Sequence, residues 1–291
     1  MMKIRILSGA VMIALIAAVL ILGFYLNPIV ITIFIAAVAA VGTYELVHNA
    51  AKVNNIWCEL LSAIYSAVMV FVFSDWLHCL QLISANSAYE VEIDFDLVYT
   101  APAAAVMISV AYILVCAVLT LINHKSLEFS HIGYLCGMPI LYAFGFSTLG
   151  SIITGINGIY YLLLILNFAS ICDTGAYFTG VTLGKRKLCP EISPKKTIEG
   201  AIGGIVSSIL VSVIIVAAFS AFDKLILTLL LTIPLCIVGM MGDLFASVIK
   251  RKADIKDYGW LIPGHGGVLD RTDSILLISP TLYCLILLGV M

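Results

Sequence analysis

Charged residues are scarce in this 291-residue chain, because Asp, Glu, Lys and Arg together make up only 11% of it. Hydrophobic residues make up 62%, and a soluble fold has no interior large enough for that much apolar surface. The composition therefore excludes one or two soluble domains and indicates a membrane protein with many spans. The formal net charge of −2 gives no overall attraction to nucleic acid, so no nucleic-acid partner is expected.

Paired cysteines and internal repeats are absent as well. The eight cysteines are scattered singly, without a C-x-x-C pair, so the sequence predicts neither a zinc site nor a disulfide framework. A secondary transporter also buries acidic residues in its spans, but it is expected to show a repeat with broken helices in matching positions. No such repeat is found, and the charged sites gather at one end of the chain, so a transporter is disfavoured.

Apolar runs along the chain predict an all-α, polytopic integral membrane protein with about nine transmembrane helices. The first run is long for a signal peptide and lacks a small-residue cleavage site, so we expect it to be retained. We expect N-terminal membrane helices over 1–130 and a C-terminal catalytic membrane domain over 131–291. The expected spans are 1–26, 28–44, 57–73, 97–122, 132–153, 159–179, 198–222, 225–244 and 272–291.

The charges of the loops predict the orientation. If the N-terminus is cytoplasmic, every basic residue except Lys224 falls on the cytoplasmic side, in agreement with the positive-inside rule. An acidic segment without lysine, residues 75–96, then falls outside. We interpret it as a solvated loop, although its alternating YEVEIDFD stretch could also form a short strand or bind a cation. The sequence thus predicts a multi-pass protein of the cell membrane whose site faces the cytoplasm.

Candidate catalytic residues are concentrated in residues 241–274, MGDLFASVIKRKADIKDYGWLIPGHGGVLDRTDS. Asp243 is expected at the end of the eighth span, where a carboxylate needs a partner; it either binds a metal ion or pairs with a nearby lysine. Asp270 and Asp273 are three residues apart where the ninth span is expected to begin, and one of them could be a helix cap. We take Asp270 as the second metal ligand with Asp243. Oxygen ligands without a His/Cys cluster favour Mg²⁺, with room for a second cation.

Groups suited to phosphate surround these acids. The glycine-rich turn includes Gly266 and Gly267, and its N–H groups can fold around an oxyanion. His265 in the same turn has two possible roles, and the sequence leaves the choice open. It either donates a hydrogen bond to phosphate or transfers a proton, or it makes a purely structural hydrogen bond. Lys252 is as well suited to lipid headgroups as to phosphate. The cations that we assign to the substrate phosphates are Lys250, Arg251, Lys256 and Arg271.

Two segments upstream add further candidates. Asp173 lies late in the sixth span, where a buried acid is costly, so a functional or pairing role is expected. Ser193 and Pro194 are a suitable N-cap and first residue for the seventh helix. Lys195 and Lys196 would then lie in its first turn, against the helix dipole, unless an anion binds there; the alternative is an ordinary positive-inside loop. Small residues at spacing four predict a helix-packing stripe of Gly200, Gly204 and Ser208.

Residues 247–273 resemble the signature of the phosphatidate cytidylyltransferases, also called CDP-diacylglycerol synthases. Residues 173–180 (DTGAYFTG) and 192–200 (ISPKKTIEG) are similar to that family too, whereas the first half of the chain shares only its hydrophobic character. The matching signature positions are Ser247, Lys250, Arg251, Lys256, Asp257, Gly259, Pro263, His265, Gly266, Gly267, Asp270, Arg271 and Asp273.

The resemblance implies that CTP and phosphatidate react to give CDP-diacylglycerol and pyrophosphate, with a phosphatidate oxygen attacking the α-phosphorus of CTP. It implies that Asp243 and Asp270 are metal ligands and that Lys195 and Lys196 contact either CTP or phosphatidate. It also suggests a homodimer. A CTP-dependent lipid kinase remains an alternative; it would transfer the γ-phosphoryl group to a lipid alcohol and release CDP.

Overall fold

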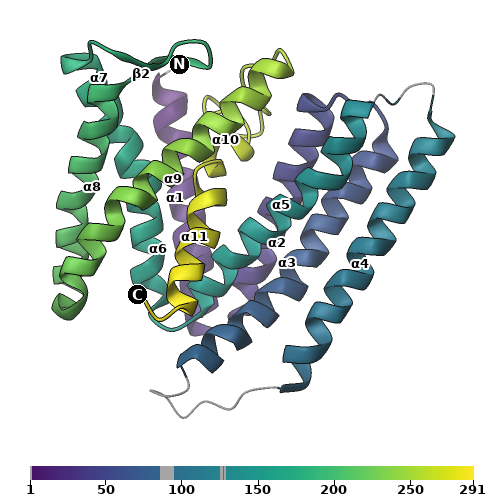
Figure 1. Ribbon diagram of the computed structural model, residues 1–291, viewed down its shortest axis with the longest axis horizontal. Coiled ribbons are helices and arrows are strands. Elements are labelled where there is room, and N and C mark those ends of the chain that lie inside the picture. The colour runs from purple at the N-terminus through teal and green to yellow at the C-terminus, as the bar shows by residue number, and fades with distance from the viewer. Residues whose placement is uncertain (1, 86–94, 125–126, 128) are drawn as a thin grey trace. The chain divides into compact units, whose positions relative to one another are not determined.

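The computed structural model describes residues 2–85, 95–124, 127 and 129–291 (Figure 1). The described chain is almost entirely helical, and its one sheet is a two-stranded hairpin. The all-α class is therefore confirmed. The elements are α1 (Met2–Tyr25), α2 (Ile29–Glu45), the π-helical turn η1 (Leu46–Ala50), α3 (Ile56–Ala85), α4 (Phe95–Ile122), α5 (Phe129–Thr154), α6 (Gly158–Leu166), the π-helical turn η2 (Asn167–Ile171), α7 (Cys172–Leu183), β1 (Lys187–Cys189), β2 (Ser193–Thr197), α8 (Ile198–Ala218), the 3₁₀ turn η3 (Phe222–Lys224), α9 (Leu225–Lys252), α10 (Leu269–Thr272) and α11 (Ile275–Leu287).

Within the described residues, eight helical stretches are long and apolar enough to cross a bilayer. They correspond to the first eight expected spans, so a multi-pass membrane protein is confirmed. The ninth expected span is different, because α11 has only 13 residues. At about 1.5 Å per residue such a helix is about 20 Å long, shorter than a hydrocarbon core of about 30 Å. The eight stretches are Leu7–Tyr25, Ile29–Ala50, Ile56–Ile83, Thr100–Ile122, His131–Thr154, Gly158–Leu183, Ile198–Ala218 and Phe222–Lys252.

Two helices run further than the sequence analysis expected. Helix α3 continues to Ala85, so residues 75–85 are helical and the expected external loop is wrong over that part. No glycine or proline interrupts this stretch, and isolated polar residues do not end a helix by themselves. Helix α9 continues to Lys252, which places Asp243 inside the helix and not at its end.

Some residues used for the predicted orientation lie outside the described part of the chain. They include residues 86–94 of the acidic segment, which cover most of the YEVEIDFD stretch, and Lys125. The side chains of Lys3 and Arg5 are likewise outside the description, although the backbone there belongs to α1. The predicted orientation therefore stays a prediction.

The chain divides into two compact units. The first unit comprises residues 2–155 and 252–272, and the second comprises residues 156–251 and 273–291. The signature segment is thus shared between them, since residues 252–272 belong to the first unit. The sequence analysis placed N-terminal membrane helices before residue 131 and a catalytic domain after it. That boundary was drawn from the positions of the predicted catalytic residues and not from compactness, so it stays a prediction.

In the first unit, α3 packs against α2, α4 and α5, and α2 also contacts α5 and α1. Buried polar side chains connect these helices: the Thr43 hydroxyl donates to Ser66 Oγ (2.8 Å), and Ser66 donates to the Pro139 carbonyl oxygen (3.2 Å). The Tyr112 hydroxyl donates to the Leu135 carbonyl oxygen (2.5 Å). Such hydrogen bonds and close packing hold membrane helices together, because lipid tails provide no hydrophobic driving force between helices.

In the second unit, α7 and α8 pack closely through small residues. A Cβ atom at Gly203 would overlap the Thr179 side chain, and one at Gly204 would lie 2.5 Å from the Cys172 carbonyl oxygen. Gly200, Gly204 and Ser208 are all buried, so the expected packing stripe is confirmed. Hydrogen bonds between hydroxyl groups connect α9 to two neighbouring helices. Thr232 of α9 is hydrogen-bonded to Ser212 of α8 (3.0 Å), and Thr228 of α9 is hydrogen-bonded to Tyr160 of α6 (3.1 Å).

Candidate active site

In the first unit, residues 253–268 form a loop between α9 and α10, which we call the signature loop. Its glycine-rich turn is closed by two hydrogen bonds: Ile262 N–H donates to the Gly266 carbonyl oxygen (2.9 Å) and His265 N–H donates to the Ile262 carbonyl oxygen (2.9 Å). Gly264 (φ 79°) and Gly266 (φ 89°) adopt left-handed backbone conformations that favour glycine. The predicted glycine turn is therefore present as a turn.

Asp270 closes the signature loop. Its Oδ2 atom accepts hydrogen bonds from Tyr258 N–H (2.8 Å) and Gly267 N–H (3.0 Å). The Gly267 N–H, which we predicted to face an oxyanion, therefore points at this carboxylate here. Carboxylates that bind metal ions are often oriented by hydrogen bonds of this kind, so the contacts suit both a metal ligand and a purely structural acid. Asp270 as a metal ligand stays a prediction.

His265 and Arg271 also brace the signature loop. The Arg271 guanidinium donates from Nε (2.9 Å) and Nη2 (2.6 Å) to the His265 carbonyl oxygen. The Ser8 hydroxyl in α1 donates to the Pro263 carbonyl oxygen (2.9 Å) and lies 2.9 Å from His265 Nδ1. A hydroxyl has only one hydrogen, so both contacts are satisfied when His265 Nδ1 carries the proton and donates to Ser8. This network assigns the lone pair of the neutral imidazole to Nε2.

The N-terminal half supplies residues to this loop that the sequence analysis missed. Glu45, at the end of α2, accepts hydrogen bonds from Val268 N–H and Leu269 N–H, both at 3.1 Å. The Asn49 side chain donates to the Tyr258 carbonyl oxygen (2.6 Å). The only sign of this role in the sequence is that Glu45 is an acid at the end of an apolar run. That sign does not identify its partners, which are more than 200 residues away in the chain.

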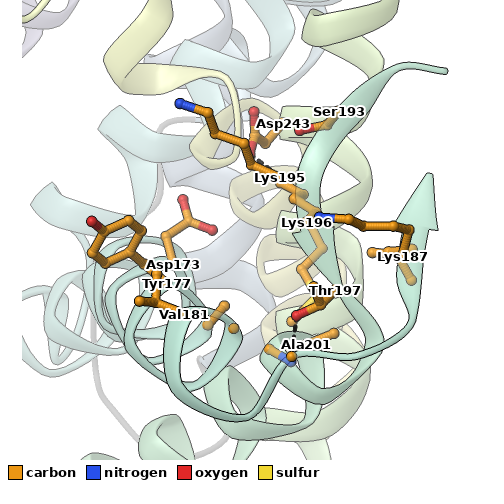
Figure 2. A pocket seen from close by; sticks show the side chains of 16 residues that line it. Asp173, Tyr177, Val181, Lys187, Ser193, Lys195, Lys196, Thr197, Ala201 and Asp243 are labelled. Atoms are coloured by element: carbon orange, nitrogen blue, oxygen red, sulfur yellow. Dashed lines mark hydrogen bonds and ion pairs between the residues drawn. The ribbon is translucent and has the colours of Figure 1, made fainter. Parts of the chain in front are cut away.

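In the second unit, a cavity of about 660 Å³ opens beside the β hairpin (Figure 2). Four predicted site residues line it: Asp173 from α7, Lys195 and Lys196 from β2, and Asp243 from α9. Figure 2 shows the side chains of Asp173 and Tyr177 on the α7 side and those of the two lysines on the strand side. The structure thus brings together two upstream segments that the sequence analysis singled out and one acid of the C-terminal stretch.

Lys196 and Asp243 form an ion pair in this cavity. Lys196 Nζ lies 2.5 Å from Asp243 Oδ2, and the two side chains are 25% and 24% exposed. The nitrogen has no aligned hydrogen-bond partner among the described residues, so the contact is a close ion pair without hydrogen-bond geometry. Asp243 therefore does pair with a lysine, but with one from β2 and not with a lysine near it in the sequence.

The local structure of the two lysines differs from the expectation. Residues 193–197 form strand β2, which pairs with β1 in an antiparallel hairpin. Helix α8 is capped by Thr197, whose Oγ1 accepts from Gly200 N–H (3.1 Å). The predicted cap at Ser193 and Pro194 is therefore wrong, because threonine at position 197 satisfies the first turn instead. Because the two lysines lie outside the helix, the helix dipole gives no reason to expect an anion beside them. Their position in the lining of the cavity is the reason to expect an anion there.

Glu199 fixes the hairpin to α8. Its carboxylate accepts hydrogen bonds from Lys185 N–H (3.0 Å) and Arg186 N–H (3.1 Å). An acidic side chain in a first helical turn also interacts favourably with the helix dipole. The basic segment that carries Lys195 and Lys196 is thus anchored at both ends of the hairpin, by Glu199 and by the Thr197 cap.

Asp273 lies between α10 and α11, and Ser274 N–H donates to its Oδ1 atom (2.8 Å). Desolvation raises the pKa of the Asp273 carboxyl to about 7, and the charges of Asp243 and Asp173 raise it as well, whereas Lys250 lowers it. In the second unit the charges of Asp243 and Asp173 therefore oppose the ionisation of Asp273.

The remaining predicted cations lie on α9 and on the signature loop. Lys250 is partly buried in the last turns of α9, and Arg251 follows it with an exposed side chain. Lys256 is also exposed, in the signature loop of the first unit. Their predicted contacts with a triphosphate stay predictions.

Comparison with known proteins decides the family. The sequence profile of the cytidylyltransferase family matches residues 3–288. The chain belongs to the cytidylyltransferase family. It is 50% identical over 116 residues to the phosphatidate cytidylyltransferase of Bacillus subtilis, covering 40% of this chain and 43% of that protein. It is 42% identical over 153 residues to the phosphatidate cytidylyltransferase of Staphylococcus haemolyticus, covering 52% of this chain and 58% of that protein.

The matches to these two relatives therefore span about half of their length. A match to the phosphatidate cytidylyltransferase of Haemophilus influenzae is longer, with 30% identity over 297 residues, 94% of this chain and 95% of that protein. The similarity thus extends into the N-terminal half, where the sequence analysis saw only hydrophobic character.

Binding of Mg²⁺ by the acids of this chain stays a prediction. Among the described residues, no group of three His, Cys, Asp or Glu side chains is arranged to hold a metal ion. Mg²⁺ is commonly bound by one or two carboxylates together with water and substrate phosphates. The donor set, carboxylates beside lysines in a cavity, therefore fits a cation that binds together with a nucleotide. Among the acids that line the cavity, Asp243 would hold such a cation.

Proposed function

We propose that this protein is a phosphatidate cytidylyltransferase, which transfers CMP from CTP to phosphatidate and releases pyrophosphate. The observation that carries the proposal is the cavity of the second unit, where Asp173, Lys195, Lys196 and Asp243 meet. These residues come from three separate elements, α7, β2 and α9, and each of them contains part of a segment that resembles this family. The names of the three relatives support the same reaction and the same substrates.

The lysines of the cavity suit the phosphates of both substrates. An ammonium group is a compact point charge that binds phosphate oxygens without requiring a planar geometry. Lys196 is held by Asp243 at 2.5 Å in the protein alone. An anion that enters the cavity would compete with Asp243 for this lysine, and the carboxylate would then be available to a cation.

The reaction requires no covalent intermediate with the protein. A phosphatidate oxygen forms a bond to the α-phosphorus of CTP while the bond between that phosphorus and the α–β bridging oxygen breaks, and pyrophosphate leaves with the electron pair. Bound Mg²⁺ supplies charge neutralisation on the triphosphate and on the leaving group. The lysines bind and orient the phosphates, and positioning of this kind is the main catalytic contribution of proteins in phosphoryl chemistry.

The charge distribution of the second unit supports a site at the cytoplasmic surface of the cell membrane. The hairpin segment carries Lys185, Arg186, Lys187, Lys195 and Lys196. Two more basic residues of this unit, Lys250 and Arg251, lie near the end of α9, whereas a single lysine, at position 224, precedes its first residue. By the positive-inside rule the basic end of α9 is cytoplasmic, where CTP is present. The homodimer suggested by the resemblance stays a prediction.

The position of the label identifies the reaction. Purified protein in detergent is incubated with Mg²⁺ and CTP labelled at either the α- or the γ-phosphorus, together with phosphatidate or a polyprenol. We expect label in the lipid phase only from α-labelled CTP with phosphatidate, and release of pyrophosphate in equal amount. Label in lipid from γ-labelled CTP with the polyprenol, accompanied by CDP, would instead establish the lipid kinase. No label in any lipid would contradict both reactions.

A further inference from the structure

Glu45 occupies an unusual position for an acid at the end of an apolar helix. It is the last residue of α2, directly before the π-helical turn η1, and it is only 5% exposed. Its two carboxylate oxygens accept separate hydrogen bonds, Oε1 from Val268 N–H and Oε2 from Leu269 N–H. These N–H groups stand at the start of α10, where a helix leaves backbone donors without partners of its own.

Two glycines of the signature loop lie against the same carboxylate. A Cβ atom at Gly259 or at Gly267 would overlap the Glu45 side chain. Both glycines are signature positions, and the sequence analysis assigned Gly267 to phosphate binding. The structure gives a different reason for them, because any larger residue would displace Glu45. Asn49, four residues further along, adds a third contact by donating to the Tyr258 carbonyl oxygen.

The contacts of Glu45 alternate with those of Asp270 along the signature loop. Tyr258 donates its N–H to Asp270 and accepts from Asn49 at its carbonyl oxygen. Gly267 donates to Asp270, and the next residue, Val268, donates to Glu45. A shift of the loop away from Glu45 therefore also moves the donors that orient the Asp270 carboxylate.

We propose that Glu45 is a positioning residue that sets the place of Asp270 for the cytidylyl-transfer reaction. Because both of its oxygens are used by backbone N–H groups, Glu45 acts on the loop and does not contact the substrates. The kinetic part of this inference rests on the proposed function. The structural part concerns how Glu45 holds residues 256–270, and it can be tested in the protein without substrates.

The test compares Glu45→Gln with a matched control, Glu59→Gln. Glu59 is also a buried acid of the first unit, 2% exposed, but it contacts His48 and not the signature loop. Glutamine keeps the size of the side chain, but its amide nitrogen cannot accept from an N–H group, so one of the two hydrogen bonds of Glu45 is lost. Both variants are purified in detergent and checked for folding by size-exclusion chromatography and thermal unfolding.

The first readout is amide hydrogen exchange without metal or substrate. We expect faster exchange in peptides covering residues 256–270 of Glu45→Gln, and wild-type exchange there in Glu59→Gln. The second readout is kinetic: kcat/KM for CTP should fall roughly tenfold in Glu45→Gln, and the Mg²⁺ concentration for half-maximal activity should rise. Glu59→Gln should keep the wild-type Mg²⁺ dependence, even where its thermal stability is lower than that of the wild type.

The outcomes separate this inference from the proposed function. Wild-type hydrogen exchange, kcat/KM and Mg²⁺ dependence in a folded Glu45→Gln would overturn the positioning role. Faster exchange together with unchanged kinetics would also overturn it, because the loop would then move without consequence for Asp270. If the wild type itself transfers no cytidylyl group, the proposed function fails, and the exchange data alone decide whether Glu45 holds the loop.

Discussion

The ion pair between Lys196 and Asp243 should be energetically coupled in the protein without substrates. Replacing Lys196 by Met leaves the Asp243 carboxylate without its counter-ion, and Asp243→Asn leaves Lys196 in the same situation. Each single variant should therefore be less stable than the wild type. The double variant should lose less stability than the sum of the two, because no uncompensated charge remains.

The geometry sets the magnitude of this coupling. Two unit charges 2.5 Å apart attract by about 7 kcal/mol at an effective dielectric constant of about 20, which is an upper bound because desolvation opposes it. Fully exposed pairs contribute about 0.2–1 kcal/mol. With side chains 25% and 24% exposed, we expect a coupling free energy between these limits, about 1–2 kcal/mol.

The assay is a double-mutant cycle of unfolding free energies, measured by SDS titration of the purified proteins in mixed micelles with EDTA present. The wild type, the two single variants and the double variant are compared under identical conditions. A coupling below about 0.5 kcal/mol would be indistinguishable from the additivity of distant sites and would refute the reasoning. Addition of Mg²⁺ and CTP should reduce the coupling, since substrate phosphate and the cation would then separate the pair.

Three further predictions concern the elements that position the site. Thr197→Ala should lower the free energy of unfolding by about 1 kcal/mol through loss of the α8 cap, whereas Thr197→Ser should retain it, as measured by thermal or SDS unfolding. Gly203→Ala should strongly reduce the yield of folded protein because its methyl group overlaps Thr179, and adding Thr179→Ala should restore part of that yield in size-exclusion profiles. Asn49→Leu should lower kcat/KM for CTP several-fold by removing the hydrogen bond that the Asn49 side chain donates to the Tyr258 carbonyl oxygen; unchanged kinetics would show that this bond does not affect the loop.

The sequence predicted most of the architecture, because hydrophobic runs of sufficient length have few other places than a bilayer. Eight of the expected spans are found among the described residues, and the α7–α8 packing stripe follows from the spacing of small residues. Helix ends were less predictable. Asp75 and Asp243 were taken as signs that a helix ends, but single acids are tolerated inside helices when they have a partner, as Asp243 has in Lys196.

The candidate site was predictable in its residue types and not in its contacts. Asp173, Lys195 and Lys196 were chosen from unfavourable burial and charge, and the structure brings them to one cavity with Asp243. The hairpin could not be foreseen, because Ser-Pro is as good a helix start as the threonine that caps α8. Glu45 was missed for a different reason: its partners are backbone N–H groups, which leave no trace in the sequence.

The most direct test of the account is cytidylyl transfer by acid variants of the two units. Purified wild type, Asp243→Asn and Asp270→Asn are incubated with α-labelled CTP and phosphatidate over a range of Mg²⁺ concentrations. Asp223→Asn is the matched control, since this acid is exposed and lies in η3 before the first residue of α9. We predict Mg²⁺-dependent label in lipid for the wild type and the control, and a loss of at least about a hundredfold in the other two variants. Full transfer by Asp243→Asn would contradict the claim that the cavity of the second unit is the site of the reaction.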